Sequence, residues 1–359
     1  MTWIYARRSM RLYSTLPLVL VALLALLGCG DDRRPPGGTP TGDAGPGVDG
    51  SVRVDGGPVP GPTGPVDPAC VDGLYRETLP NPDAPIDDIA FTGDVPAFVD
   101  AVLMRRYPFG YELVAGGRTS RSFPQDCSVV FANSPSSAAD VYQALSTITH
   151  ECGHIWDGAL SSGSTNVYEV NAELTLTAMR GDTTSRGGDT FARSLIRGDS
   201  YQTSRPACSG GSGCDFYADV YLDGDPTNGS FEGGDQGFNM LFDEVVQYVN
   251  SLATEYAFAD RRASGTSTSA RDGILTLLWY MERYLHMARL DTPAAYTRIA
   301  MDPIWRNAIL TLWGRAWLYL GVSADDPSLG IDDAALEALV LDPTLLDEIE
   351  RLRTLAGCS

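Results

Sequence analysis

Five apolar residues recur at helical spacing near the middle of the chain: Val141, Leu145, Ile148, Cys152 and Ile155. Steps of four, three, four and three residues are typical of the buried face of an amphipathic α-helix. Ser134-Pro135 resembles a helix start, with a capping serine and a proline in the first turn. Gly158 is a natural stop. The chain is therefore predicted to pack a long helix against a core.

Other stretches follow the period of a strand. Apolar and polar residues alternate over residues 168–177 and, less cleanly, over residues 216–222, which predicts half-buried strands. The short apolar run Cys127–Ala132 is also predicted to be a strand. Helical spacing returns over residues 238–256. Together these patterns predict an α+β fold.

Aspartates mark the starts of several further helices. Asp94 precedes a helix predicted to run to about Arg106, Asp302-Pro303 begins one that Gly321 ends, and Asp342-Pro343 begins another. The last hundred residues show helical patterns throughout. We therefore expect a helical C-terminal lobe from about residue 260.

The N-terminus has the pattern of an export signal. Three arginines within the first eleven residues precede an apolar run over residues 16–27, which is shorter than the roughly 20 residues that a membrane span needs. The run ends in Leu26-Leu27-Gly28-Cys29, which resembles the lipobox of bacterial lipoproteins. That resemblance implies that residues 1–28 are a lipoprotein signal peptide, that Cys29 carries a lipid anchor, and that the protein is exported and held at a membrane.

The next forty residues lack hydrophobic periodicity. Residues 29–69 are dominated by glycine, proline and aspartate, a composition that cannot offset the entropy of ordering. We expect a disordered tether there, followed by one folded domain over residues 70–359. With 43% hydrophobic residues in 359, the chain can bury a sizeable core.

Charge and cysteine content narrow the possible partners and compartment. The formal net charge of −20 repels phosphate backbones, so no nucleic acid partner is expected. Six cysteines follow Cys29, an even number that suggests disulfides in an exported protein. Cys208 and Cys214 flank a glycine- and serine-rich loop and are predicted to pair. The pairing of the others stays open.

The predicted central helix carries His150-Glu151-Cys152-Gly153-His154. Residues four apart lie on one helical face, so both histidines can bind one metal ion with Glu151 beside them. In this arrangement two histidines hold Zn²⁺ and the glutamate acts as general base. The chain has only three histidines, and two of them form this pattern. His286, the third, is interpreted as a structural histidine paired with an acid.

The motif resembles the active-site sequence HExxH of the zincin metallopeptidases. That resemblance implies a zincin-like fold with a small mixed sheet beside the active-site helix. It also implies bound Zn²⁺ and hydrolysis of peptide or protein substrates, with Glu151 activating a zinc-bound water. The metzincin branch needs glycine and histidine where this chain has Asp157 and Leu160, so that branch is excluded. A gluzincin-like site, with a glutamate as the third ligand, is expected instead.

Several carboxylates compete for the third ligand position. Glu244 lies on the predicted helix over residues 238–256 and is the favoured ligand, because zincins hold this glutamate on a second helix. Glu173 has the spacing of one gluzincin group but falls on a predicted strand; Glu169 and Asp157 are further alternatives. Tyr248, one turn after Glu244, is predicted to donate a hydrogen bond to the oxyanion during catalysis.

A different class of function competes with the peptidase hypothesis. A surface lipoprotein can keep a zincin scaffold while binding a partner or a polymer without turnover. Zinc content and peptide cleavage separate the two hypotheses.

Overall fold

The computed structural model describes residues 60–61, 64–73, 75–162, 164–179, 238–263 and 265–358. The first helices are α2 (Val95–Arg106), α3 (Pro108–Arg118), α4 (Cys127–Ala132) and α5 (Ala138–Leu160). Two antiparallel pairs of strands are β1 (Pro60–Gly61) with β2 (Gly64–Pro65) and β3 (Thr165–Asn171) with β4 (Leu174–Met179). The later elements are α7 (Phe238–Phe258), η3 (Ala259–Arg261), α8 (Ala270–Asp291), α9 (Pro293–Ala300), α10 (Pro303–Val322), η4 (Pro327–Leu329), α11 (Asp333–Val340) and α12 (Pro343–Ala356).

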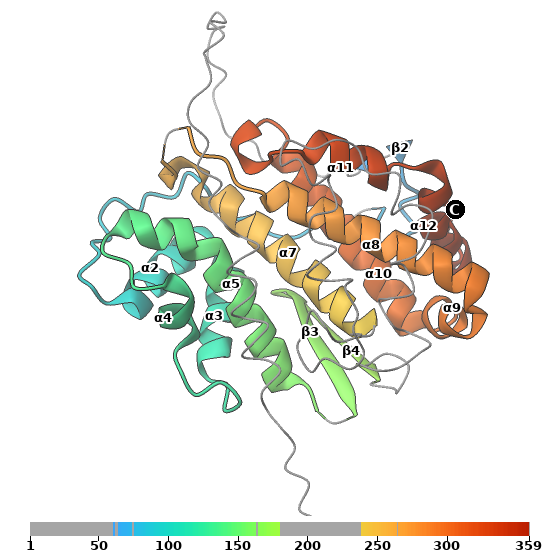
Figure 1. Ribbon diagram of the computed structural model, residues 1–359, viewed down its shortest axis with the longest axis horizontal. Coiled ribbons are helices and arrows are strands. Elements are labelled where there is room, and N and C mark those ends of the chain that lie inside the picture. Colours follow the sequence, from blue (N-terminus) through green and yellow to red (C-terminus); the bar gives the residue numbers. More distant parts are fainter. Residues whose placement is uncertain are drawn as a thin grey trace, which may run out of the picture.

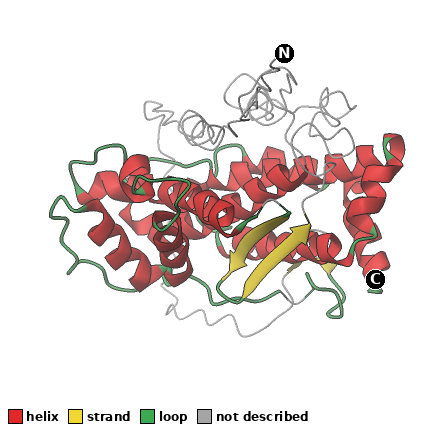
Figure 2. Ribbon diagram, turned by 90° about the horizontal axis from the view of Figure 1, so that it is seen from below, coloured by secondary structure: helices red, strands yellow, loops and turns green. Residues whose placement is uncertain are grey.

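Helices make up most of the described chain, and the predicted α+β class is confirmed. Helix α5 packs against α3 and α4 on one side and against α7 on the other, and α7 packs against α8 (Figure 1). Strand β3 contacts α5 and α7, while β4 contacts α10. Figure 2 shows the β3–β4 hairpin with helices on either side of it. The described strands pair antiparallel, so the expected mixed sheet is not what these residues form.

The alternating residues 168–177 form a hairpin where a single strand was predicted. The side chain of Asn171 accepts a hydrogen bond from the backbone N–H of Glu173 at 2.9 Å, and the chain reverses there. The register pairs Tyr168 with Leu176. The turn itself pairs Asn171 with Leu174, which would invert the alternation, but an irregularity in the register between Glu169 and Asn171 restores it. Tyr168 and Leu176, which lie opposite each other, then share a face. Sequence period alone therefore cannot distinguish this hairpin from one long strand.

The prediction of a strand over Cys127–Ala132 is wrong, because these residues form helix α4. The Asp126 side chain caps it by accepting from the backbone N–H of Ser128 at 2.9 Å. Asn133 ends it in the left-handed conformation, at φ 51°. A short apolar run is compatible with a strand or a helix, and the caps at Asp126 and Asn133 favour the helix here.

The other helix boundaries lie close to their predicted positions. Asp94, Asp302 and Asp342 cap α2, α10 and α12 with their side chains, as predicted. Helix α5 begins at Ala138, capped by Ser137, and ends at Leu160, two residues beyond Gly158. Ser134 has a positive φ of 60°, so the chain is still turning where the helix start was predicted.

Two disulfides join distant parts of the described chain. Cys70 pairs with Cys358 near the C-terminus, and Cys127 at the start of α4 pairs with Cys152 in the middle of α5. The predicted Cys208–Cys214 pair and the predicted strand over residues 216–222 lie outside the described residues, as do Cys29 and residues 1–28.

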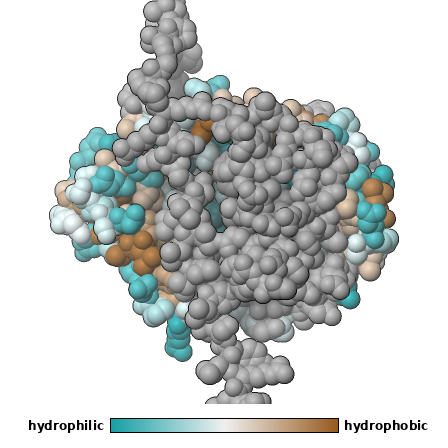
Figure 3. Space-filling model, viewed as in Figure 1, coloured by the Kyte–Doolittle hydropathy of each residue, from teal (hydrophilic) through white to brown (hydrophobic). Residues whose placement is uncertain are grey.

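The hydrophobic core runs through the helical part of the molecule. Trp279 and Trp313 are among its largest fully buried side chains. Where Figure 3 colours the surface, hydrophobic residues form small areas among hydrophilic ones. The exposed large hydrophobic residues lie on separate elements, Met104 on α2 and Val129 on α4 among them. None of the described helices has an apolar stretch long enough to cross a membrane.

A buried acid in α8 makes stability depend on pH. Glu282 is fully buried, and neither of its carboxylate oxygens has a hydrogen-bond partner among the described residues. Burial raises its pKa well above the usual value, and the carboxylates of Asp342 and Glu348 raise it further. The folded protein therefore holds a proton that the unfolded chain releases above about pH 4.3. The free energy of unfolding therefore falls as the pH rises from about 4.3 towards the raised pKa of Glu282 in the folded protein.

We expect Glu282→Gln to stabilise the protein at neutral pH and to leave stability near pH 4 almost unchanged. Between these limits, each unit rise in pH should lower the free energy of unfolding of wild type by up to about 1.4 kcal/mol relative to that of the variant. Thermal melts at a series of pH values measure this difference. Glu112→Gln on α3, an exposed site, is the matched control. Parallel pH profiles for Glu282→Gln and wild type would contradict the prediction.

Candidate metal centre

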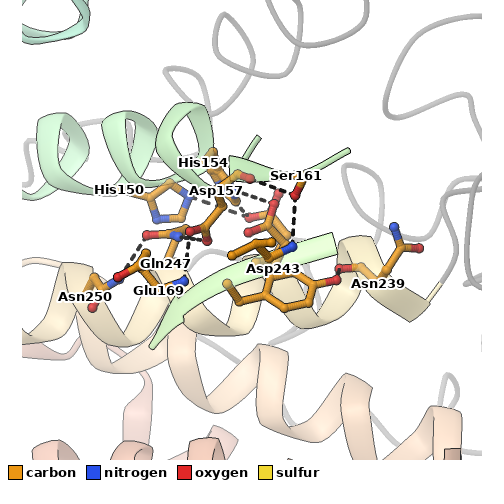
Figure 4. A network of polar contacts seen from close by, with 12 residues as sticks. His150, His154, Asp157, Ser161, Glu169, Asn239, Asp243, Gln247 and Asn250 are labelled. Atoms are coloured by element: carbon orange, nitrogen blue, oxygen red, sulfur yellow. Dashed lines mark hydrogen bonds and ion pairs between the residues drawn. The ribbon is translucent and has the colours of Figure 1, made fainter. Parts of the chain in front are cut away.

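Helix α5 presents its two histidines on the side opposite the disulfide. Cys152, between them in sequence, is fully buried and bonded to Cys127 of α4, so it points away from His150 and His154 as predicted. The histidines face α7, which runs antiparallel to α5: Ser146 contacts Glu255, His150 contacts Ser251, and His154 contacts Asp243. That antiparallel pairing brings the middle of α7 against the motif (Figure 4).

Three ligand atoms converge at this interface. His150 Nε2 lies 3.0 Å from His154 Nε2, and Glu244 Oε2 lies 3.6 Å from the first and 3.5 Å from the second. A tetrahedral zinc ion with bonds of about 2.0 Å would hold its ligand atoms about 3.3 Å apart. Glu244 Oε2 is buried and accepts no hydrogen bond from the described residues. The set therefore fits a metal ion, and within the described residues it is the one such group of histidine, cysteine and acidic side chains.

The outer nitrogens of both histidines have partners of their own. His150 Nδ1 lies 3.0 Å from Ser251 Oγ, and His154 Nδ1 lies 2.9 Å from Asp243 Oδ2. If each Nδ1–H donates to these oxygens, each Nε2 keeps a lone pair for the metal. Asp243 and Ser251 did not enter the sequence-based prediction. Asp243 is the neighbour of Glu244, and that adjacency is the one signal that could have pointed to it.

The electrostatics of the cluster depend on burial and on the paired charges. Burial lowers the pKa of His150, although the Glu244 and Asp243 carboxylates oppose this. For His154, burial also lowers the pKa, but those two carboxylates outweigh it and the net direction is upward. Burial raises the pKa of Glu244, yet the two histidines hold it well below the usual range. The two histidines therefore favour the ionised form of Glu244, the form in which a carboxylate can bind a metal ion.

Glu151 is buried next to this cluster. Its Oε1 atom has no hydrogen-bond partner among the described residues. Burial raises the pKa of Glu151 to about 8; the charge of His154 lowers it, and those of Glu244 and Asp243 raise it. The Glu151 carboxyl is therefore close enough to His154, Glu244 and Asp243 for their charges to act on it. A carboxyl with a pKa near neutrality can take up and release a proton at working pH.

Tyr248 lies against the first histidine. Its ring centroid is 4.9 Å from that of His150, with the two rings nearly perpendicular. The same ring also lies beside Gly273 of α8, where a Cβ would be 2.3 Å from Cε1 of the tyrosine. Glycine at position 273 therefore leaves room for the tyrosine to reach the histidine. The predicted role of Tyr248 as an oxyanion donor requires this proximity.

The remaining candidate ligands lie outside the cluster. Glu173 is exposed in the turn of the β3–β4 hairpin, and the Oε1 atom of Glu169 accepts from Thr175 at an exposed site. Asp157 is buried near the cluster, but it accepts from the backbone N–H of Glu169 and from Gln247, both at 2.9 Å. His286 pairs instead with Glu348 of α12. Of the four carboxylates considered, Glu244 is the one gathered with both histidines.

Comparisons with known proteins do not place this chain. No protein-family model matches it, and the searches of curated proteins and of solved structures found no match either.

Proposed function

We propose that this protein is a zinc-dependent peptidase with a gluzincin-like site on a zincin-like fold. The observation that carries the proposal is the convergence of His150 Nε2, His154 Nε2 and Glu244 Oε2 within 3.0–3.6 Å of one another at a buried helix interface. Three protein ligands with a fourth position left for water or substrate characterise catalytic rather than structural zinc sites. The histidines and Glu244 are the proposed zinc ligands.

The surrounding residues supply the groups that peptide hydrolysis needs. When bound, zinc would act as a Lewis acid, polarising the substrate carbonyl and lowering the pKa of a coordinated water to about 7. Glu151 accepts a proton from the attacking water at a carboxylate oxygen and returns it to the departing amine. Tyr248, packed on His150, donates a hydrogen bond to the carbonyl oxygen as negative charge develops there.

Zinc binding and peptide cleavage test the proposal together. The purified protein is expected to contain about one zinc ion per chain by elemental analysis, and to cleave members of a broad peptide library until a chelator is added. Zinc with no cleavage across the library would favour the alternative, a lipoprotein that binds a partner without turnover. Absence of zinc would overturn the proposal.

The third ligand has its own test. Glu244→Gln is expected to weaken zinc binding by more than about 100-fold, because loss of an outer hydrogen bond alone typically weakens it 10–100-fold. Competition with a chromogenic chelator measures the affinity. Glu173→Gln, in the exposed hairpin turn, makes the same chemical change and should bind zinc like wild type. The reverse ranking of these two variants would assign the ligand to Glu173.

We also propose that the protein is exported and anchored to a membrane through a lipid on Cys29. The two disulfides of the described domain support this, because disulfides persist in oxidising compartments outside the cytosol. Cys29→Ser is expected to move the protein from the detergent-rich to the aqueous phase in a detergent partition assay. Cys208→Ser is a control that leaves the N-terminus unchanged. A Cys29→Ser protein that stays in the detergent phase would contradict the anchor.

A further inference from the structure

Gly153 of α5 lies directly against the side-chain amide of Gln247 of α7. A Cβ on Gly153 would lie 2.1 Å from Gln247 Oε1 and 2.6 Å from its Cδ, closer than nonbonded atoms approach. Gln247 can keep its position only with glycine opposite. Gly153 precedes the ligand His154, and Gln247 lies three residues after the ligand Glu244. The contact therefore joins α5 and α7 next to the residues of the proposed metal centre.

Hydrogen bonds at both ends hold the Gln247 amide in place. Its Nε2 donates to Asp157 Oδ2 and its Oε1 accepts from Asn250 Nδ2, each at 2.9 Å. Asn250 Oδ1 in turn accepts from Arg315 Nη1 at 2.8 Å. Figure 4 shows Gln247 between Asp157 and Asn250. Gln247 and Asn250 are fully buried, so a rotation of the amide would leave buried polar groups unpaired.

The contact lies between the two places where α7 meets the histidines. On one side, Ser251 contacts His150 at 3.0 Å; on the other, Glu244 Oε2 lies 3.5 Å from His154. A larger residue at position 153 must either push α7 away or expel the Gln247 amide from its hydrogen bonds. Either change disturbs the approach of Glu244 to the imidazoles, since packed helices at an interface leave little free space.

We infer that Gln247 is a positioning residue for the metal. Its contact with Gly153 sets the separation of α5 and α7 at which Glu244 reaches both histidines. The Gln247 amide binds Asp157 and Asn250, and it is not part of the group formed by His150, His154 and Glu244. It acts through the spacing of the two helices that carry the proposed ligands. The inference rests on the proposed zinc site, and it adds a requirement for glycine and glutamine at two positions that the HExxH pattern leaves unspecified.

A pair of glycine substitutions in the full chain tests this contact. Gly153→Ala is expected to lower zinc affinity by about 10–100-fold, the size of typical outer-shell effects, as measured by chelator competition. Gly158→Ala adds the same methyl group to the same helix, where nothing lies within 4 Å, and should stay within about twofold of wild type. The visible absorption of bound Co²⁺ is a second readout, because its bands report ligand geometry independently of catalysis.

A double-mutant cycle shows whether the effect passes through Gln247. Gln247→Ala alone should weaken zinc binding about tenfold. Adding Gly153→Ala to this variant should lower zinc affinity by less than about a further threefold, because the Gln247 atoms that would clash with the new methyl group are gone. If Gly153→Ala alone fails to fold, the double variant should restore folding.

Three results would overturn the inference: equal zinc affinities of the two alanine variants, additive effects in the cycle, or a double variant that does not restore folding. Wild-type protein that binds no zinc would overturn the proposed function itself, and the ligand role assumed here with it. The wild-type measurement therefore distinguishes the two failures.

Discussion

Glu151→Gln is expected to lower kcat for peptide cleavage by about 10²–10⁴-fold, the range over which a positioned general base accelerates a reaction. The substitution keeps the size of a side chain that is 2% exposed and removes its capacity to accept a proton. Zinc content should stay at the wild-type level, because Glu151 does not belong to the group of ligand atoms. Steady-state kinetics on one library peptide, together with elemental analysis, measure both quantities.

The control for this substitution is Glu169→Gln. Glu169 was an alternative metal ligand, and its Oε1 atom accepts only from Thr175 at an exposed site of the hairpin among the described contacts. Its neutralisation should leave kcat and zinc content unchanged. Undiminished cleavage by Glu151→Gln would remove Glu151 as the base, whereas loss of zinc in that variant would assign it a role in binding.

Arg315→Met is expected to lower the free energy of unfolding by about 3–5 kcal/mol, as breaking a buried ion pair does. Arg315 is fully buried; its Nε donates to Glu77 Oε2 at 2.7 Å and its Nη1 donates to Asn250 Oδ1 at 2.8 Å. Methionine leaves Glu77 buried without its cation. That loss is a large part of the roughly 5–15 kcal/mol that stabilises a typical domain. Denaturant unfolding monitored by tryptophan fluorescence measures it.

An exposed ion pair supplies the matched control for Arg315. Arg105 pairs with Asp88 at a site where the side chains are 38% and 66% exposed. Solvent screens such pairs, so Arg105→Met should leave the unfolding midpoint unchanged. Similar midpoints for the two methionine variants would show that the buried position of Arg315 contributes nothing to stability. Replacing Glu77 as well as Arg315 should recover part of the loss, since no lone buried charge then remains.

Local patterns allowed much of the helical architecture to be predicted. The caps Asp94, Asp302 and Asp342 mark their helices in the sequence because a capping aspartate acts on backbone groups within one turn of itself. The two segments assigned the wrong element, Cys127–Ala132 and residues 168–177, are short. There, one cap or one Asx turn changes the outcome without changing the apolar pattern.

The sequence by itself determined that His150 and His154 share one face of a helix with Cys152 on the opposite side, because helical spacing is a local property. It did not determine which carboxylate faces them. Only the antiparallel packing of α7 on α5 decided that Glu244 lies with the histidines, and it added Asp243, Ser251 and Gln247. The hairpin turn after Asn171 in turn left Glu173 exposed. The register between two helices ninety residues apart depends on contacts along their whole length, and no spacing within either helix encodes it.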